Sequence, residues 1–207
     1  MSKMERAART RQTILRAAAV VFEENGFHGS RLTAITKQSG LTMGAIYFHF
    51  ASKEDLARAV MNEQADDLEL PGGPDGLQRL IDITMYLADQ LRVNELLRAG
   101  VRLAVEQRAF GMRDETPYMN WAGLFREQLV AARASGDVLP EVDEEDLSLL
   151  LVSAYSGTQL VSELVNGRAD LPDRILVMWR YLLPGIATPQ ARARLRLGGT
   201  EIAGAVG

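Results

Sequence analysis

The sequence predicts an all-α fold with two parts, an N-terminal helix-turn-helix domain and a larger C-terminal helical bundle. Apolar side chains recur at helical spacing through nearly the whole chain. No segment shows the sustained alternation and hairpin turns that β-strands require. The clearest break is the Pro-Gly-Gly-Pro-Asp-Gly stretch at residues 71–76, which favours a connection between elements. We expect one domain over residues 1–52 and a second over residues 53–207.

The apolar spacing indicates four helices before that break. The first should end at Asn25-Gly26, because glycine is favoured just after a helix, and two short helices should follow over residues 32–38 and 43–48. Ser52-Lys-Glu-Asp55 has the form of a capping box. A longer fourth helix should therefore begin there and run to about Leu68.

Further amphipathic segments follow the break. They are expected over residues 77–90, 94–107, 117–135, 143–166 and 172–183. The segment 143–166 contains more apolar residues than one narrow stripe needs: Leu147, Leu149–Val152, Leu160, Val161, Leu164 and Val165. The tail after Pro184 ends in glycine-rich sequence, and we expect it to be only partly ordered.

Charge is divided unevenly along the chain. The net charge is −4, but residues 1–60 hold nine Lys or Arg and five Asp or Glu, a net of +4. A basic head on an acidic body is the pattern of a small DNA-reading module joined to a part that does not touch DNA. The alternative is that an excess of this size over sixty residues arises by chance.

Composition narrows the class of protein. No apolar run reaches the ~18 residues that span a bilayer, and Met1–Gln12 is polar and Arg-rich, unlike a signal peptide. The chain has no Cys, which fits a reducing compartment and excludes thiolate zinc sites and a Cys nucleophile. We find no phosphate-binding glycine loop, nucleophile elbow or zinc-protease motif. We expect a cytoplasmic protein that is not an enzyme and has no cofactor or metal.

The two short helices joined through Gly40 have the proportions of a helix-turn-helix. The second helix, which Thr42 can cap, would stand clear of the body and enter the major groove. Exposure is expected for Thr42, Met43, Gly44 and Tyr47. Inward packing is expected for Ala45, Ile46 and Phe48, with Phe50 as an anchor.

The stretch Leu41-Thr-Met-Gly-Ala-Ile-Tyr-Phe-His-Phe-Ala-Ser-Lys-Glu-Asp-Leu56 resembles the DNA-binding signature of the tetracycline-repressor (TetR) family. The resemblance implies three N-terminal helices for DNA, a fourth helix as a lever, and a helical C-terminal domain for ligand and dimer contacts. It implies that the segments 143–166 and 172–183 form the dimer interface, and a two-fold dimer would read a palindromic operator.

The resemblance also assigns DNA contacts by position. Tyr47, His49 and Lys53 would contact phosphates through hydrogen bonds and charge. The start of the second helix could contact the flanking strand through Ser30, Arg31 and Thr33. Base edges would face Thr42, Met43 and Gly44. Met43 departs from relatives that carry Lys or Arg, because methionine can touch a thymine methyl but makes no bidentate contact to guanine.

Within this family the chain is similar to the γ-butyrolactone receptors of antibiotic-producing actinomycetes. The similarity rests on Tyr47-Phe-His-Phe, Leu97–Ala104, Trp121, Gly157-Thr158 and Met178-Trp179. It implies a small lactone, butenolide or furan autoregulator as ligand, and target genes in antibiotic production. An apolar cavity with a few polar groups suits such a molecule.

Six residues are expected to bind this ligand. Trp121 would form one wall of the pocket, and Thr158 and Gln64 would supply hydrogen bonds. The remaining candidates for the lining are Tyr86, Phe125 and Tyr155. The alternative for each of these residues is ordinary core packing. Because Gln64 is expected on the same helix as Lys53, a ligand that pulls on Gln64 could swing that helix as a rigid lever.

Two other regulators share this predicted fold. One is a repressor of an efflux or resistance gene that senses a drug or a biosynthetic intermediate. The other is a pseudo-receptor that binds DNA but responds to an antibiotic or its precursor. A purely structural helical protein would leave the basic head unexplained.

Overall fold

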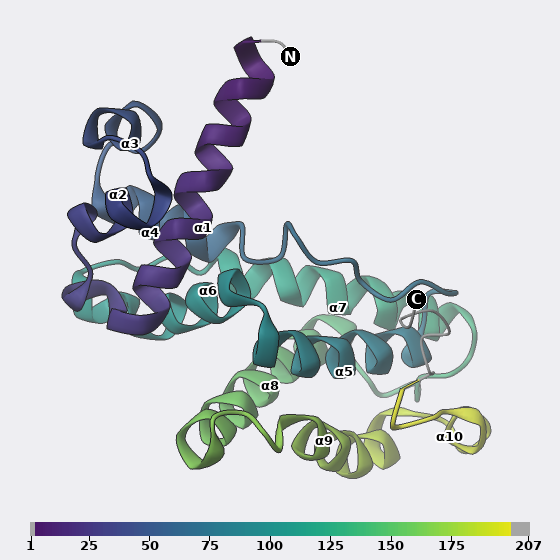
Figure 1. Cartoon of the computed structure of the whole chain (residues 1–207). Helices are drawn as coiled ribbons and strands as arrows, with labels where there is room; N and C mark the ends of the chain where they lie inside the picture. Colours follow the sequence, from purple (N-terminus) through teal and green to yellow (C-terminus); the bar gives the residue numbers. More distant parts are fainter. Residues whose placement is uncertain (1–2, 200–207) are drawn as a thin grey trace, which may run out of the picture. The chain divides into compact units, whose positions relative to one another are not determined.

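The computed structural model describes residues 3–199, and in this part of the chain it contains helices and no strand beyond one isolated bridge between Val138 and Ala187 (Figure 1). The predicted all-α class is therefore confirmed. The helices are α1 (Lys3–Gly29), α2 (Leu32–Ser39), α3 (Met43–His49), α4 (Lys53–Asn62), α5 (Leu77–Val93), α6 (Glu95–Glu106), the 3₁₀ turn η1 (Gln107–Phe110), α7 (Thr116–Ala134), α8 (Glu144–Asn166), α9 (Leu171–Ile186) and α10 (Pro189–Arg194).

The chain forms two compact units. Of the described residues, the first contains 3–68 together with Asn94–Pro117, and the second contains Glu69–Val93 and 118–199. The helix-turn-helix therefore packs in one unit with α4 and α6, which come later in the sequence. The predicted functional boundary after residue 52 stays a prediction.

Local signals set the helix ends in the first unit. Gly40 has a φ of 69°, a left-handed conformation that L side chains rarely adopt, and it turns the chain from α2 into α3. Thr42 caps α3 by accepting a hydrogen bond from the Ala45 N–H at 3.2 Å. Ser52 caps α4 by accepting from the Asp55 N–H at 3.0 Å. These predicted ends are confirmed.

The structure corrects two predicted boundaries. α4 ends at Asn62, and residues 63–67 form turns, so the predicted extension to Leu68 is wrong. The chain after Pro184 is more regular than predicted, because α9 continues to Ile186 and α10 follows. The end of the tail, residues 200–207, lies outside the described residues.

The core of the first unit lies between α1, α4 and α6. α6 packs against both of the other helices, and Ile14, Phe22 and Leu56 are fully buried. Arg98 of α6 forms an ion pair with Glu23 of α1 at 2.9 Å. α6 thus supports α1 and α4 by apolar packing and by charge.

The second unit is centred on α9, which packs against α5, α8 and α10. Trp179 of α9 is fully buried, and its indole Nε1–H donates to the Thr84 hydroxyl of α5 at 2.7 Å. The Thr84 hydroxyl in turn donates to the Ile81 carbonyl at 2.8 Å. The Trp179–Thr84 bond therefore satisfies the one polar atom of the indole inside the core.

We predict that Thr84→Val destabilises the protein by about 1–3 kcal/mol, because it leaves the buried Trp179 N–H without an acceptor. Urea unfolding followed by far-ultraviolet circular dichroism measures this loss. Thr84→Ser is the matched control, since it keeps the hydroxyl. Equal loss in the two variants would show that the hydrogen bond contributes nothing.

Candidate DNA-binding surface and ligand site

α3 presents one side to the protein and the other to solvent. Ile46 is 1% exposed, and Phe50, just after the helix, is 3% exposed, so these two side chains anchor it. Thr42 and Gly44 are exposed and Met43 is half-buried. The outer side of this short helix is therefore free to approach a ligand as large as DNA.

Two aromatic side chains extend from the exposed side of α3. Tyr47 is 53% exposed, as predicted, but Phe48 is 80% exposed, so its predicted inward packing is wrong. Phe48 lies two residues after the buried Ile46, about 200° around a helix with 3.6 residues per turn. It therefore points away from the core, with the His49 ring against its edge at a centroid distance of 5.0 Å.

The predicted phosphate contacts divide into surface and interior residues. Arg31 and Thr33 are exposed at the start of α2, and His49 is half-buried. Ser30, by contrast, is 3% exposed, and its hydroxyl lies within hydrogen-bonding distance of the Val21 and Gly26 carbonyls, at 2.9 and 2.6 Å. Ser30 thus stabilises the turn between α1 and α2, and its buried hydroxyl is not available for the predicted phosphate contact.

Lys53 is the first residue of α4 and is half-buried. Its ammonium nitrogen lies 4.3 Å from the centre of the Phe27 ring. Burial lowers the pKa of Lys53, and the nearby Glu54 carboxylate acts in the opposite direction. The charge is thus held against an aromatic face at a helix N-terminus.

Gln64 lies in the turns after α4, not on the helix as predicted. It is 4% exposed, and its Oε1 atom has no hydrogen-bond partner. It packs against Gly100 of α6, where a Cβ atom would stand 2.5 Å from the Gln64 Cβ and 3.0 Å from the Val60 carbonyl oxygen. Only glycine lets α6 come this close to the end of α4.

The other predicted ligand residues belong to the second unit. Trp121 of α7 is half-buried, and its ring centre is 6.4 Å from that of the buried Phe125. Tyr86 is half-buried on α5. Tyr155 of α8 is buried, its hydroxyl has no hydrogen-bond partner, and burial raises its pKa well above the usual range. The Tyr155 hydroxyl is therefore a neutral, unused hydrogen-bond donor.

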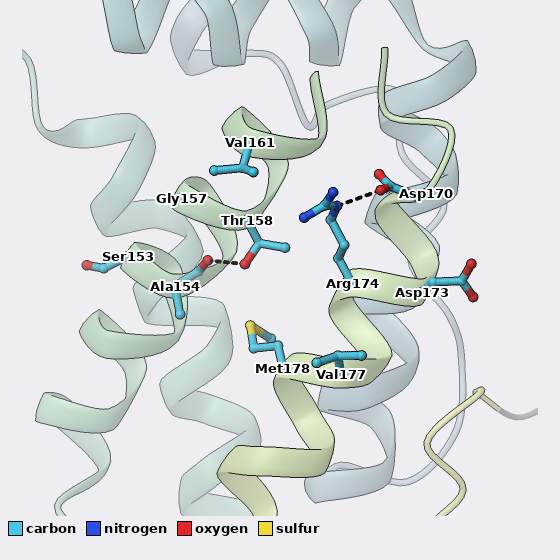
Figure 2. Close-up of a pocket in the computed structure, with 10 residues that line it drawn as sticks. All are labelled: Ser153, Ala154, Gly157, Thr158, Val161, Asp170, Asp173, Arg174, Val177 and Met178. Atoms are coloured by element: carbon cyan, nitrogen blue, oxygen red, sulfur yellow. Dashed lines mark hydrogen bonds and ion pairs between the residues drawn. The ribbon is translucent and has the colours of Figure 1, made fainter. Parts of the chain in front are cut away.

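Thr158 lines a groove of about 720 Å³ between α8 and α9 (Figure 2). Its hydroxyl donates to the Ala154 carbonyl of its own helix at 2.7 Å. Val161, Val177 and Met178 make the groove largely apolar. The groove runs along a face of exposed apolar side chains: Leu149, Leu150, Leu160, Val161, Leu164, Val165, Val177 and Tyr181.

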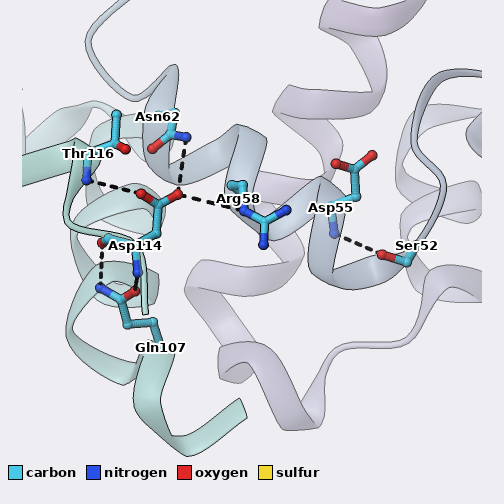
Figure 3. A network of polar contacts seen from close by, with 7 residues as sticks. All are labelled: Ser52, Asp55, Arg58, Asn62, Gln107, Asp114 and Thr116. Atoms are coloured by element: carbon cyan, nitrogen blue, oxygen red, sulfur yellow. Dashed lines mark hydrogen bonds and ion pairs between the residues drawn. The ribbon is translucent and has the colours of Figure 1, made fainter. Parts of the chain in front are cut away.

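A polar network joins α4 to the segment between η1 and α7 (Figure 3). The Asp114 carboxylate accepts hydrogen bonds from the Thr116 N–H at 3.0 Å and from the Asn62 side chain at 3.4 Å, and Arg58 lies 3.7 Å away. These contacts lower the pKa of Asp114, with the bond to Thr116 as the largest cause. No local sequence pattern predicts this network, because α4 and the segment around Asp114 are far apart in the chain.

Within residues 3–199, no three His, Cys, Asp or Glu side chains gather as metal ligands would. No helix in the same range is long and apolar enough to cross a membrane.

Comparison with known proteins gives matches along most of the chain. Residues 14–60 match the family "Bacterial regulatory proteins, tetR family", and residues 75–189 match "Tetracyclin repressor-like, C-terminal domain". The A-factor receptor protein of Streptomyces griseus is 37% identical over 196 residues, which cover 95% of this chain and 70% of that protein.

Solved structures agree with these sequence matches. The crystal structure of TylP, a TetR regulator from Streptomyces fradiae, has a TM-score of 0.84 and 39% identity, and the match covers 93% of each chain. A γ-butyrolactone receptor described as ArpA-like has a TM-score of 0.68 and 33% identity, covering 91% of this chain and 94% of that one.

A helix-turn-helix whose second helix turns its outer face to solvent, joined to a helical body, defines a DNA-binding transcriptional regulator. The matches over both halves then establish the family. The chain belongs to the TetR family of bacterial regulatory proteins, as the signature beginning at Leu41 predicted.

We predict that Gly100→Ala destabilises the first unit by about 1–3 kcal/mol, because the added methyl group would overlap Gln64. Gly123→Ala is the matched control. A Cβ at Gly123 meets nothing within 4 Å, so alanine there should stabilise α7 by up to about 1 kcal/mol. Thermal unfolding of the two variants checks this, and equal melting temperatures would rule out the close approach.

Proposed function

We propose that this protein is a repressor that binds a palindromic operator as a dimer and leaves it when a small autoregulator of the lactone, butenolide or furan class binds. The observation that carries the proposal is the outer side of α3, where Thr42, Gly44, Tyr47 and Phe48 are exposed on an anchored helix. It acts in the cytoplasm, where the operator is, and it is a regulator rather than an enzyme.

Base edges are read from α3 and phosphates are held from its surroundings. Thr42, Met43 and Gly44 face the bases, and the exposed Phe48 adds an apolar surface that suits a thymine methyl. The phosphate contacts come from Arg31, Thr33, Tyr47, His49 and Lys53. Apolar readout of this kind fits a recognition helix that lacks a charged side chain at position 43.

A second copy of the chain covers the exposed apolar face of α8 and α9. Leu164 is 87% exposed and Tyr181 is 79% exposed, and a contiguous apolar face of this kind marks an interaction site. A two-fold dimer would bring together two copies of α3 for the two halves of a palindrome. Covering this face also closes the groove that Thr158 lines.

The ligand class rests on the similarity to the A-factor receptor protein and to the γ-butyrolactone receptor. The chemistry of the predicted residues supports it. Trp121, Phe125 and Tyr86 offer apolar walls, and the unused Tyr155 hydroxyl can donate to a lactone carbonyl. Gln64 Oε1 is an unused acceptor for a ligand hydroxyl. By the same similarity, we propose that the target genes serve antibiotic production.

The release mechanism involves α4, although not as one long rod. α4 is ten residues long and stops before Gln64. Asp114 joins α4 to the start of α7, and α7 carries Trp121 five residues after its first residue. A ligand that moves the start of α7 therefore pulls on α4 through Asp114, and α4 begins at Lys53.

We predict that Phe48→Ala lowers affinity for the operator by about fivefold per half-site, roughly 1 kcal/mol, because an apolar base contact is lost. Affinity for unrelated DNA should not change, since phosphate contacts dominate there. Fluorescence anisotropy with both DNAs measures the two affinities. Val130→Ala, an exposed change on α7, is the control, and an equal loss on both DNAs would refute base readout by Phe48.

We predict that Trp121→Ala keeps operator binding but weakens the response to a synthetic γ-butyrolactone at least tenfold. The loss of an aromatic wall from a pocket typically costs about 2 kcal/mol or more. Titrating the ligand into a gel-shift assay measures the response. Met119→Ala on the same helix is the control. A normal response of Trp121→Ala would show that the pocket is elsewhere, and release only by an unrelated drug would favour an efflux regulator.

A further inference from the structure

Phe27 lies at the centre of an aromatic cluster in the first unit. It directly follows Gly26, whose φ of 64° and ψ of −179° interrupt the helical geometry of α1 at the predicted stop. The Phe110 ring stacks on it with a centroid distance of 3.9 Å and an interplanar angle of 19°. Phe22 and His28 complete its aromatic surroundings, at centroid distances of 6.1 and 5.6 Å. The Phe27 ring is therefore fixed from several sides, and it is 5% exposed.

The Lys53 ammonium and the Phe110 ring contact the same Phe27 ring. A ring stacked at 3.9 Å covers one face of its neighbour, so the ammonium, 4.3 Å from the Phe27 centre, lies against the other face. The three groups are thus layered in the order Phe110, Phe27, Lys53. The electron-rich face of a benzene ring attracts a cation, which makes the last contact specific for an aromatic residue.

Phe110 reaches this cluster from η1, far from Lys53 in sequence. The His28 ring, whose Nε2 lies 3.1 Å from the Ala109 carbonyl oxygen, holds the same segment next to α1. The Gln107 side chain fixes the residues that follow, through its Nε2, which donates to the Asp114 carbonyl oxygen at 3.1 Å. The segment that carries Phe110 is therefore held by contacts that do not involve Lys53.

A lysine side chain has many rotamers, and ordering it on binding DNA costs entropy. An ammonium already held over a ring pays less of that cost and keeps its N–H groups free to donate outward. Desolvation beside Phe27 is consistent with such a fixed position, since it lowers the pKa of Lys53. Lys53 is the first residue of α4, where the helix N-terminus also attracts a phosphate.

We propose that Phe27 and Phe110 are positioning residues for DNA binding: Phe110 supports the Phe27 ring, and Phe27 holds the Lys53 ammonium in place for a DNA phosphate. This inference rests on the phosphate contact of Lys53 in the proposed function. Phe110 belongs to η1, between α6 and α7. In this inference it contributes to DNA binding without contacting DNA itself.

The test measures operator affinity against salt concentration for the full-length protein. Phe110→Leu keeps apolar volume and removes the stacked ring, Phe110→Tyr keeps the ring, and Lys53→Gln removes the charge. Each phosphate contact contributes about 0.9 to the slope of log K against log salt, so Lys53→Gln should lower the slope by about one for each bound copy of the chain. Phe110→Leu should also lower this slope, and it should weaken operator binding by about two- to fivefold.

Two further comparisons separate positioning from general destabilisation. Phe110→Tyr should restore the wild-type slope, and the double variant Phe110→Leu with Lys53→Gln should bind no more weakly than Lys53→Gln alone. In the unbound wild-type protein, the Lys53 Hε protons should resonate upfield because of the Phe27 ring current. This measurement tests the contact even where Phe110→Leu fails to fold.

A wild-type slope for Phe110→Leu, additive losses in the double variant, or unshifted Lys53 Hε protons would each overturn the inference. If Lys53→Gln leaves the slope unchanged, Lys53 does not contact a phosphate. Both the proposed phosphate contact and the inference that rests on it are then wrong. If Lys53→Gln lowers the slope but Phe110→Leu does not, only the inference fails.

Discussion

The close approach of α6 to the end of α4 is the constraint on which the DNA-binding unit depends. Gly100 lets the α6 backbone come against Gln64 and the Val60 carbonyl, and α6 also packs along α1. The short helices α2 and α3 bury little surface of their own, and helices this short are marginal without tertiary packing. The recognition helix is therefore held by a frame to which a helix from outside the helix-turn-helix contributes.

The packing of the recognition helix α3 on this frame determines which of its side chains are exposed. Ile46 and Phe50 anchor the inward side of α3, and of its seven residues Gly44, Tyr47 and Phe48 are exposed. Tyr47 and Phe48 both lie on the outer side. In the proposed function, sequence specificity would then depend on small and apolar groups, which read thymine methyls and the shape of the groove more readily than guanine edges.

Features encoded by neighbouring residues could be predicted from the sequence. The caps at Thr42 and Ser52 and the turn at Gly40 are of this kind, as is the family signature that begins at Leu41. Features that depend on distant packing could not. The sequence predicts inward packing for Phe48, yet its side chain is 80% exposed, because it lies about 200° around α3 from the buried Ile46. The pairing of Asp114 with Asn62 leaves no local pattern at all.

The segment from η1 to the start of α7 is where a ligand signal and DNA binding can meet. Asp114 joins this segment to α4 by a 3.4 Å hydrogen bond to Asn62 and a 3.7 Å ion pair with Arg58. Contacts of this kind, partly exposed to water, contribute about 1 kcal/mol or less each. A coupling of about 1–3 kcal/mol is enough for an allosteric response. In the proposed release mechanism, these contacts, acting as a set, are strong enough to pass a movement of the start of α7 on to α4.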